Sequence, residues 1–258
     1  MTILDVKHLS ISFGGLKAVS DFSLALDEHE LVAIIGPNGA GKTTIFNLLT
    51  GMYVPDEGSI ELQGKNLFKK SPHEFTRAGI ARTFQNIRLF HRASCLDNLM
   101  IAQSMHAEYA MPNAIFRTPR FCRQEAQMFR KAEEYLDIFH LDQKADVLAS
   151  NLSYGEQRRL EIARALITAP KVLLLDEPCA GMTSSEMDEV MDLIAMIRQR
   201  FGISIILIEH HMSVVMRVAD RIKVVDFGET IAEGLPEQIQ KNPRVIAAYL
   251  GGKNHGNA

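Results

Sequence analysis

The chain has 258 residues, of which 47% are hydrophobic and 23% are charged, and its formal net charge at pH 7 is −3. This length and composition fit one large domain, or a domain carrying a sub-domain, that buries a full hydrophobic core. The slightly acidic balance lacks the basic excess of a nucleic-acid-binding protein, so we expect no nucleic-acid partner.

The three cysteines, Cys95, Cys122 and Cys179, are odd in number and have no metal-binding spacing. Reduced, structural thiols in a cytosolic protein are therefore expected. The first residues, MTILDVKHLS, contain no apolar signal region, and the longest apolar runs, VLLL and ISIILI, are too short to cross a bilayer. We expect a chain that is soluble on its own and that meets a membrane only through partner proteins.

The first part of the chain predicts strands on either side of a glycine-rich loop. The first 30 residues alternate apolar and polar in short runs, which is typical of half-buried antiparallel strands. The run LVAII at 31–35 is apolar on both faces, as in a central parallel strand, and a helix is predicted from Lys42. The segment GSIELQG is expected to return as a strand that turns at 64–66.

From residue 88 to 160 the pattern becomes helical. In the segment QEAQMFRKAEEYLDIFHL, apolar residues recur on one helical face and charged residues on the other. The residues of this apolar face are Met128, Ala132, Tyr135, Leu136 and Phe139. We predict a helical sub-domain inserted into an α/β core. Its middle, AMPNAIFRTPRFCR, contains two prolines and is expected to be an irregular connection.

The α/β core is predicted to comprise residues 1–87 and 161–251. VLLLD at 172–176 and SIILIEH at 204–210 read as buried strands, separated by a helix over 185–201. IKVVDFGETIAEG predicts a hairpin, and a short helix is expected to end near Tyr249. The polar, glycine-rich tail at 252–258 is expected to be disordered.

The loop GPNGAGKTT at 36–44 matches the phosphate-binding P-loop pattern GxxxxGK[ST]. Its glycines let main-chain N–H groups surround phosphates, and the following helix adds its dipole. Lys42 is expected at the β- and γ-phosphates, Thr43 as a hydroxyl ligand of Mg²⁺ and Thr44 as a further phosphate contact. A chance glycine-rich turn is the alternative, which the flanking strand and helix disfavour. The nucleotide-binding residues predicted here are Gly36, Pro37, Asn38, Gly39, Ala40, Gly41, Lys42, Thr43 and Thr44.

The segment VLLLDEP suggests hydrolysis of the bound nucleotide. Asp176 is expected to hold Mg²⁺ from a strand neighbouring the P-loop strand, and Glu177 to polarise a water for attack on the γ-phosphate. Two acids that merely cap a strand end are the alternative. The guanine-reading motif Asn-Lys-x-Asp of GTPases is absent from the sequence.

A second anion-binding helix start is predicted in NLSYGEQRRLEIARAL at 151–166. Ser153 and Gly155 lie just before a long amphipathic helix. One nucleotide needs one P-loop, so this segment is expected to serve a nucleotide held by another subunit. An ordinary capped helix, with Ser153 as N-cap and Glu156 completing a capping box, is the alternative.

Taken in order, these motifs resemble those of ATP-binding cassette (ABC) ATPases. LSYGEQ resembles the signature motif, RTFQ supplies Gln85 at the Q-loop, and IEHH supplies His210 at the switch histidine. Phe13 matches the aromatic residue that stacks on adenine. The resemblance covers about residues 3–251. It implies an α/β P-loop NTPase fold of the ABC type, with an N-terminal antiparallel β sub-domain and an inserted helical sub-domain.

The resemblance also implies how the site is shared. Two subunits would lie head to tail, with ATP between residues 36–44 of one subunit and the signature segment of the other. Glu177 and His210 would be catalytic, and Gln85 would touch Mg²⁺ alongside Thr43 and Asp176. The implied cofactors are ATP and Mg²⁺. The signature residues that would face the nucleotide are Ser153, Tyr154, Gly155, Glu156 and Gln157.

Several of these positions have simpler explanations. Phe13 could belong to the core of an alternating strand, and Gln85 could be a surface amide. A metal site at Glu209, His210 and His211 is disfavoured, because adjacent strand residues face opposite ways.

The chain also departs from the family pattern. Tyr154 replaces the usual second glycine, and the usual aspartate is absent from CAGMT, so no cross-site aspartate contact is expected.

The sequence around the motifs resembles that of the ATPase subunits of branched-chain amino acid importers, and most closely the larger of their two ATPases. The resemblance rests on Tyr154, QRRLEIAR, IEHHM, VMRVADRI and the ending PEQIQKNPRVIAAYLG. It implies a second ATPase subunit, identical or not, two membrane permeases and, indirectly, an extracytoplasmic substrate-binding protein. The chain would lie on the cytoplasmic face of the inner (plasma) membrane, bound through its permeases.

Other functions remain as alternatives. A urea or short-amide importer and a lipopolysaccharide exporter share the resemblance. A non-transport ABC ATPase is disfavoured, because the chain has one cassette and neither heptads nor metal-binding cysteines. A subunit that binds nucleotide without turnover is disfavoured by the presence of Lys42, Asp176, Glu177 and His210.

A basic group flanks Gln85 and consists of Arg82, Arg88, His91 and Arg92. It could meet acidic residues of a permease, and a solvated basic loop is the equal alternative.

Overall fold

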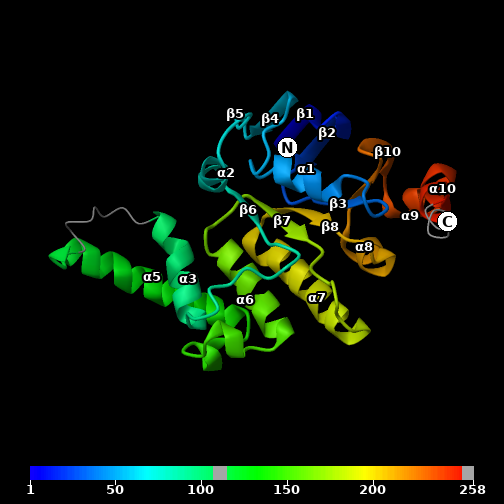
Figure 1. The fold of residues 1–258 in the computed structure, drawn as a ribbon. Coiled ribbons are helices and arrows are strands. Elements are labelled where there is room, and N and C mark those ends of the chain that lie inside the picture. The colour runs from blue at the N-terminus through cyan, green and yellow to red at the C-terminus, as the bar shows by residue number, and fades with distance from the viewer. Residues whose placement is uncertain (107–114, 252–258) are drawn as a thin grey trace. The chain divides into compact units, whose positions relative to one another are not determined.

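The computed structural model describes residues 1–106 and 115–251 (Figure 1). The chain divides into two compact units, a core unit formed by Met1–Gln85 with Lys171–Ala258 and a helical unit formed by Asn86–Pro170. The second boundary lies ten residues beyond the predicted one at 160/161. The predicted boundary would cut helix α6 (Tyr154–Leu166), whereas the whole helix belongs to the helical unit. The tail predicted to be disordered, 252–258, lies outside the described residues.

The core unit contains two sheets and the helices that pack on them. One sheet has the strand order β2–β1–β4–β5, and the other has the order β10–β9–β3–β8–β7–β6. The elements are β1 (Thr2–Phe13), β2 (Leu16–Asp27), β3 (Leu31–Ile35), α1 (Lys42–Leu48), β4 (Glu57–Leu62), β5 (Lys65–Asn66), α2 (Pro72–Ala78), β6 (Ile80–Arg82), β7 (Val172–Asp176), α7 (Ser184–Phe201), β8 (Ser204–Ile208), α8 (Met212–Val218), β9 (Arg221–Asp226), β10 (Glu229–Gly234), α9 (Pro236–Gln240) and α10 (Pro243–Gly251).

Both sheets have the predicted strand directions. The N-terminal strands β1, β2 and β4 pair antiparallel. In the larger sheet, β3 pairs parallel with β8 and β9, β7 pairs parallel with β8 and β6, and the predicted hairpin adds β10 antiparallel to β9. Strands β3, β7 and β8 are buried along their whole length, as their unbroken apolar runs predict.

Successive residues of β3 pack in two different hydrophobic clusters, one on each face of the sheet. Ile34 packs in the larger cluster with Phe22 of the antiparallel sheet and Phe46 of α1. Its neighbour Ile35 packs on the opposite face with Val215 of α8. The sheet therefore has a hydrophobic layer on each face, and the carboxyl ends of its parallel strands meet at one edge, where sheets of this kind bind ligands.

The helical unit contains α3 (Cys95–Gln103), α5 (Pro119–Ile138) and α6, with short 3₁₀ turns at Ser104–His106, Asp142–Lys144 and Ala149–Asn151. The apolar face predicted for residues 128–139 is confirmed, because all five of its side chains are buried. The predicted irregular connection is wrong at its end, since α5 begins at Pro119. Proline is favoured at the first position of a helix, and the Thr118 hydroxyl caps the helix by accepting from Phe121 N at 3.4 Å. Residues 107–114 of that connection lie outside the described part.

None of the described helices combines the length and apolarity needed to cross a bilayer.

Candidate active site

The P-loop leaves the end of β3 and enters α1 at Lys42, as predicted. Gly41 has φ 99°, and a Cβ there would lie 2.8 Å from Ala18 O, so the loop can close only with glycine at this position. The loop forms most of the wall of a cavity of about 340 Å³. The residues lining this cavity are Leu16, Lys17, Ala18, Asn38, Gly39, Ala40, Gly41, Lys42, Thr43, Thr44, Glu177 and Phe227.

Lys42 places its charge inside the P-loop. Its Nζ donates to Gly36 O at 2.7 Å and to Pro37 O at 2.8 Å, and the residue is buried. Burial lowers the pKa of the Lys42 ammonium, while the carboxylates of Glu177 and Asp176 act in the opposite direction. The ammonium is therefore held against the loop carbonyls, within the walls of the cavity.

The acidic pair lies at the end of β7, but not on the strand next to β3. Strand β8 lies between them, so the prediction of a neighbouring strand for Asp176 is wrong. The predicted catalytic histidine, His210, follows this intervening strand. The loops that follow β3, β8 and β7 therefore carry the P-loop, His210 and Glu177 in that spatial order.

Glu177 is the centre of the polar cluster at this edge. Its Oε2 accepts from Gln85 Nε2 at 2.9 Å and lies 3.7 Å from His210 Nδ1. Its main-chain N–H donates to Ile208 O at 2.9 Å, and its φ of 44° lies in the left-handed region, which long side chains rarely adopt. Such backbone strain concentrates at functional sites. The structure thus brings together Glu177, His210 and Gln85, and the exposed Gln85 donates its amide to the Glu177 carboxylate.

The second carboxylate, Asp176, is paired with a residue that the sequence did not connect to it. Arg82 of β6 donates from Nη2 to Asp176 Oδ2 at 2.6 Å and from Nη1 to Asn47 Oδ1 at 2.7 Å. The guanidinium lies over the rings of Phe46 and Phe84, with its Cζ 5.3 and 4.9 Å from their centroids.

Both partners of this ion pair are buried, with side-chain exposures of 5% and 6%. The interpretation of Arg82 as part of a surface group for a permease is therefore wrong, because its guanidinium is committed inside the core unit. Arg88, His91 and Arg92 are exposed.

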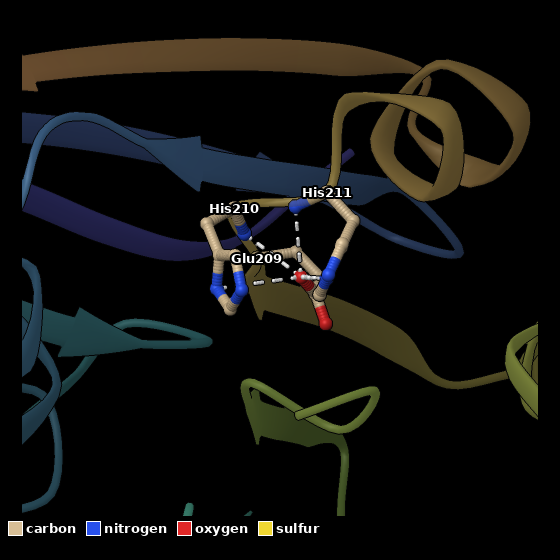
Figure 2. Close-up of side chains that lie close together, drawn as sticks. All are labelled: Glu209, His210 and His211. Atoms are coloured by element: carbon tan, nitrogen blue, oxygen red, sulfur yellow. Dashed lines mark hydrogen bonds and ion pairs between the residues drawn. The ribbon is translucent and has the colours of Figure 1, made fainter. Parts of the chain in front are cut away.

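Glu209 and the two histidines after it form a compact cluster, which Figure 2 shows with both imidazoles turned toward the Glu209 carboxylate. The His211 Nδ1 lies 3.0 Å and the His210 Nδ1 3.8 Å from Glu209 Oε2, and the two ring centroids are 4.1 Å apart. The expectation that these residues face opposite ways is wrong. Strand β8 ends at Ile208, so the alternation of a strand does not extend to them.

Phe13, the predicted adenine contact, ends β1 and is 45% exposed. Its ring meets Tyr53 edge to face, with centroids 5.2 Å apart. The alternative of a core residue is therefore wrong. The sequence did not point to the two large apolar residues of the cavity wall, Leu16 and Phe227, which are exposed by 72% and 86%.

The signature segment belongs to the helical unit, where it opens α6. The capping box is present: Ser153 Oγ accepts from Glu156 N at 3.4 Å, and Glu156 Oε2 accepts from Ser153 N at 3.0 Å. The hydrogen bond from Lys144 is the main cause that lowers the pKa of Glu156. Gln157 Nε2 donates back to Leu152 O at 3.0 Å. The capped-helix alternative thus accounts for Ser153 and Glu156 within one chain.

The remaining signature residues face outward. Tyr154 is 44% exposed, and a Cβ added to Gly155 would meet no atom within 4 Å. Further along α6, Arg158 and Glu161 form a fully buried ion pair at 2.8 Å, and Glu161 also accepts from Arg88 N at 3.2 Å. This network ties the segment after Gln85 to the signature helix, and its sequence signal was only two opposite charges three residues apart on a helix.

The residues of the core unit have the chemistry that a magnesium nucleotide requires. The P-loop offers main-chain N–H groups and the Lys42 ammonium to phosphate oxygens. The Thr43 hydroxyl, the Asp176 carboxylate and the Gln85 amide are oxygen donors, which Mg²⁺ prefers. Glu177 is a carboxylate beside this set that can accept a proton from water.

Comparison with known proteins shows the family of the chain. Residues 19–180 match the family model described as "ABC transporter". The chain belongs to the ABC transporter ATPase family. Residues 229–254 match a further model, "Branched-chain amino acid ATP-binding cassette transporter". The predicted fold and the predicted family are therefore confirmed.

The chain is 45% identical to the high-affinity branched-chain amino acid transport ATP-binding proteins BraF of Pseudomonas aeruginosa and LivG of Escherichia coli, over 96% of this chain and 98% of each relative. It is 34% identical to the lipopolysaccharide export system ATP-binding protein LptB of Haemophilus influenzae, over 97% of this chain and 98% of that protein. Among solved structures, the ADP conformation of an ATP-binding cassette of an ABC transporter matches with a TM-score of 0.84 and 31% identity. That match covers 97% of this chain and 99% of the other.

Proposed function

We propose that this ABC ATPase is the motor subunit of an importer of branched-chain amino acids. The observation that carries the motor is the Glu177 carboxylate, which lies on the wall of the P-loop cavity and is held by Gln85 and His210. A carboxylate in this position can orient and deprotonate a water beside the terminal phosphate of a nucleotide held by the P-loop.

Each residue of the site has a distinct part in the proposed reaction. Lys42 and the P-loop N–H groups bind the phosphate oxygens, and Glu177 accepts the proton of the attacking water. His210, on the loop beside Glu177, is positioned to contact the γ-phosphate. Mg²⁺ would be held by Thr43, Asp176 and Gln85 and would supply positive charge to the phosphates.

We further propose that a second ATPase subunit completes the site. The outward-facing signature residues of the helical unit, Tyr154 and Gly155 among them, would close on ATP bound to the core unit of that second subunit. Phe13 would stack on the adenine. The departure at Tyr154 changes a side chain only, and Gly155 keeps its main-chain N–H in the first turn of α6.

The proposal that the transported substrate is a branched-chain amino acid rests on similarity to known proteins. Relatives named for high-affinity branched-chain amino acid transport share 45% of their residues with this chain, against 34% for the lipopolysaccharide export relative. The match over residues 229–254 points the same way. The partners we propose are two permeases that hold the subunit at the cytoplasmic face of the membrane and an extracytoplasmic substrate-binding protein.

Uptake of labelled leucine by source cells tests the proposal. Lys42→Ala removes the charge at the phosphates and should abolish high-affinity uptake, measured at leucine levels low enough to suppress secondary carriers. Lys65→Ala is the matched control, because Lys65 is an exposed lysine of the antiparallel sheet and should leave uptake at the parental rate.

Normal leucine uptake in Lys42→Ala cells, with expression and loss of nucleotide binding confirmed, would contradict this cargo. Urea and short amides would then be tried as labelled substrates. Recovery of the protein outside the washed membrane fraction would instead favour a non-transport ABC ATPase.

A further inference from the structure

Glu209 is a buried carboxylate to which the proposed reaction gives no part. It follows the last residue of β8 and is 0% exposed. Burying a carboxylate is costly unless hydrogen-bond donors satisfy it. Around Glu209 these donors are main-chain N–H groups from two different loops, together with the ring of His211.

The two oxygens of Glu209 serve different loops. Oε1 accepts from Cys179 N at 3.1 Å, in the turn two residues beyond Glu177. Oε2 accepts from His210 N at 2.8 Å and from His211 N at 3.0 Å. The Glu209 carboxylate therefore joins the loop that carries Glu177, the proposed base, to the loop that carries His210, the proposed phosphate contact.

A main-chain hydrogen bond also joins the Glu177 loop to the end of β8, next to Glu209. Glu177 N donates to Ile208 O, the residue before Glu209, at 2.9 Å. The Glu177 side chain then lies 3.7 Å from His210 Nδ1. The relative placement of Glu177 and His210 is thus fixed by one main-chain bond and by the Glu209 carboxylate.

We infer that Glu209 is a positioning residue for ATP hydrolysis, acting through His210 and Glu177. The inference rests on the proposed motor function. A carboxylate suits this place because both of its oxygens only accept, whereas an amide would turn an NH₂ group toward one of the two sets of N–H donors. Misplacing a catalytic group by about 1 Å can cost about 10²-fold in rate.

The side chains of Glu209, His210 and His211 are poorly suited to bind a metal ion. Glu209, His210 and His211 offer donor atoms within 4.8 Å of one another. Glu209 Oε2, however, already accepts from two main-chain N–H groups and lies within reach of the His211 ring. Its lone pairs are therefore committed to holding the loop.

A double-mutant cycle tests the inference in the purified complex, in which this subunit is assembled with its second ATPase subunit and the permeases. Glu209→Gln, His210→Ala and the double variant are compared with the parent for ATPase kcat, KM and equilibrium ATP affinity. We expect Glu209→Gln to lower kcat by about 10-fold or more and to change KM and ATP affinity by less than about 2-fold. In the His210→Ala background it should add less than about 3-fold, because coupled residues are not additive.

Ser204→Ala is the structural control. Ser204 is buried at the opposite end of β8, where its hydroxyl donates to Asp27 O and accepts from His29 N, both at 2.9 Å. This variant should lower thermal stability and leave kcat unchanged.

Three results separate the explanations. A parent complex that does not hydrolyse ATP would remove the proposed function itself. An active parent with parental kcat in Glu209→Gln, or a full kcat loss in both backgrounds, would overturn the positioning role. If Glu209→Gln does not fold, His211→Phe tests the positioning role instead, because this variant removes only the ring contact to Glu209 Oε2. A loss of about 2- to 5-fold in kcat would support the role. An unchanged kcat would overturn it.

Discussion

At the scale of single residues, the ion pair of Asp176 and Arg82 is the feature that changes the site most. The sequence identifies Asp176 because an apolar strand ends in it. Arg82 carries no comparable signal, since it stands in a short run, IARTF, whose strand character follows only from pairing with β7. The sequence therefore predicts a surface charge at Arg82, whereas the structure buries its side chain. Its burial depends on Asp176, ninety-four residues further along the chain.

Arg82→Met tests the energetic weight of this pair. The substitution leaves a buried carboxylate without its partner, which costs about 3–5 kcal/mol of the free energy of unfolding. Denaturation by urea measures this loss. Arg217→Met is the matched control: Arg217 contacts both Asp188 and Asp192, but all three side chains are about half exposed or more, so a change within about 1 kcal/mol is expected. Equal effects of the two substitutions would show that burial of the Arg82 pair contributes nothing.

At the scale of elements, periodicity identified those that have one buried face. The apolar face of α5 and the unbroken runs of β3, β7 and β8 all place their residues in the core, as expected. The elements that were missed are short. Helix α2 and strand β6 hold seven and three residues, too few to repeat a pattern. The start of α5 was missed because a proline marks the beginning of a helix as readily as an irregular connection.

The antiparallel sheet depends on a glycine that periodicity does not reveal. Strand β1 has a register shift between Lys7 and Ser10, and Gly58 of β4 lies against it with φ 107°. A Cβ on Gly58 would lie 2.5 Å from Lys7 O and 2.7 Å from His8 O. Both atoms belong to the main chain of the bulge, which cannot move aside without breaking the pairing of β1 with β4.

Gly58→Ala should therefore destabilise the core unit more than Gly64→Ala does. Gly64 also has a left-handed φ, 76°, but a Cβ there meets no atom within 4 Å. The left-handed conformation costs about 1–2 kcal/mol in both variants, and the steric clash should add about 1–3 kcal/mol at Gly58 alone. Thermal unfolding of the two variants measures the difference, and equal midpoints would refute the clash.

At the scale of the whole molecule, the sequence motifs fall into two compact units. The P-loop, Gln85, Asp176, Glu177 and His210 belong to the core unit, and the signature segment belongs to the helical unit. Each of these motifs can be located from the sequence, because each motif is local. The contacts among them could not be foreseen, since they depend on the strand order β3–β8–β7, which places the His210 loop between the P-loop and the Glu177 loop.

Glu177→Gln tests most directly whether this molecule hydrolyses ATP with Glu177 as the base. The amide keeps the size of the side chain but cannot take a proton from water. ATP affinity should be retained, an ATP-bound dimer should accumulate, and the hydrolysis rate should fall by about two or more orders of magnitude. A variant that hydrolyses ATP at the parental rate would contradict the role of Glu177 and, with it, this account of the site.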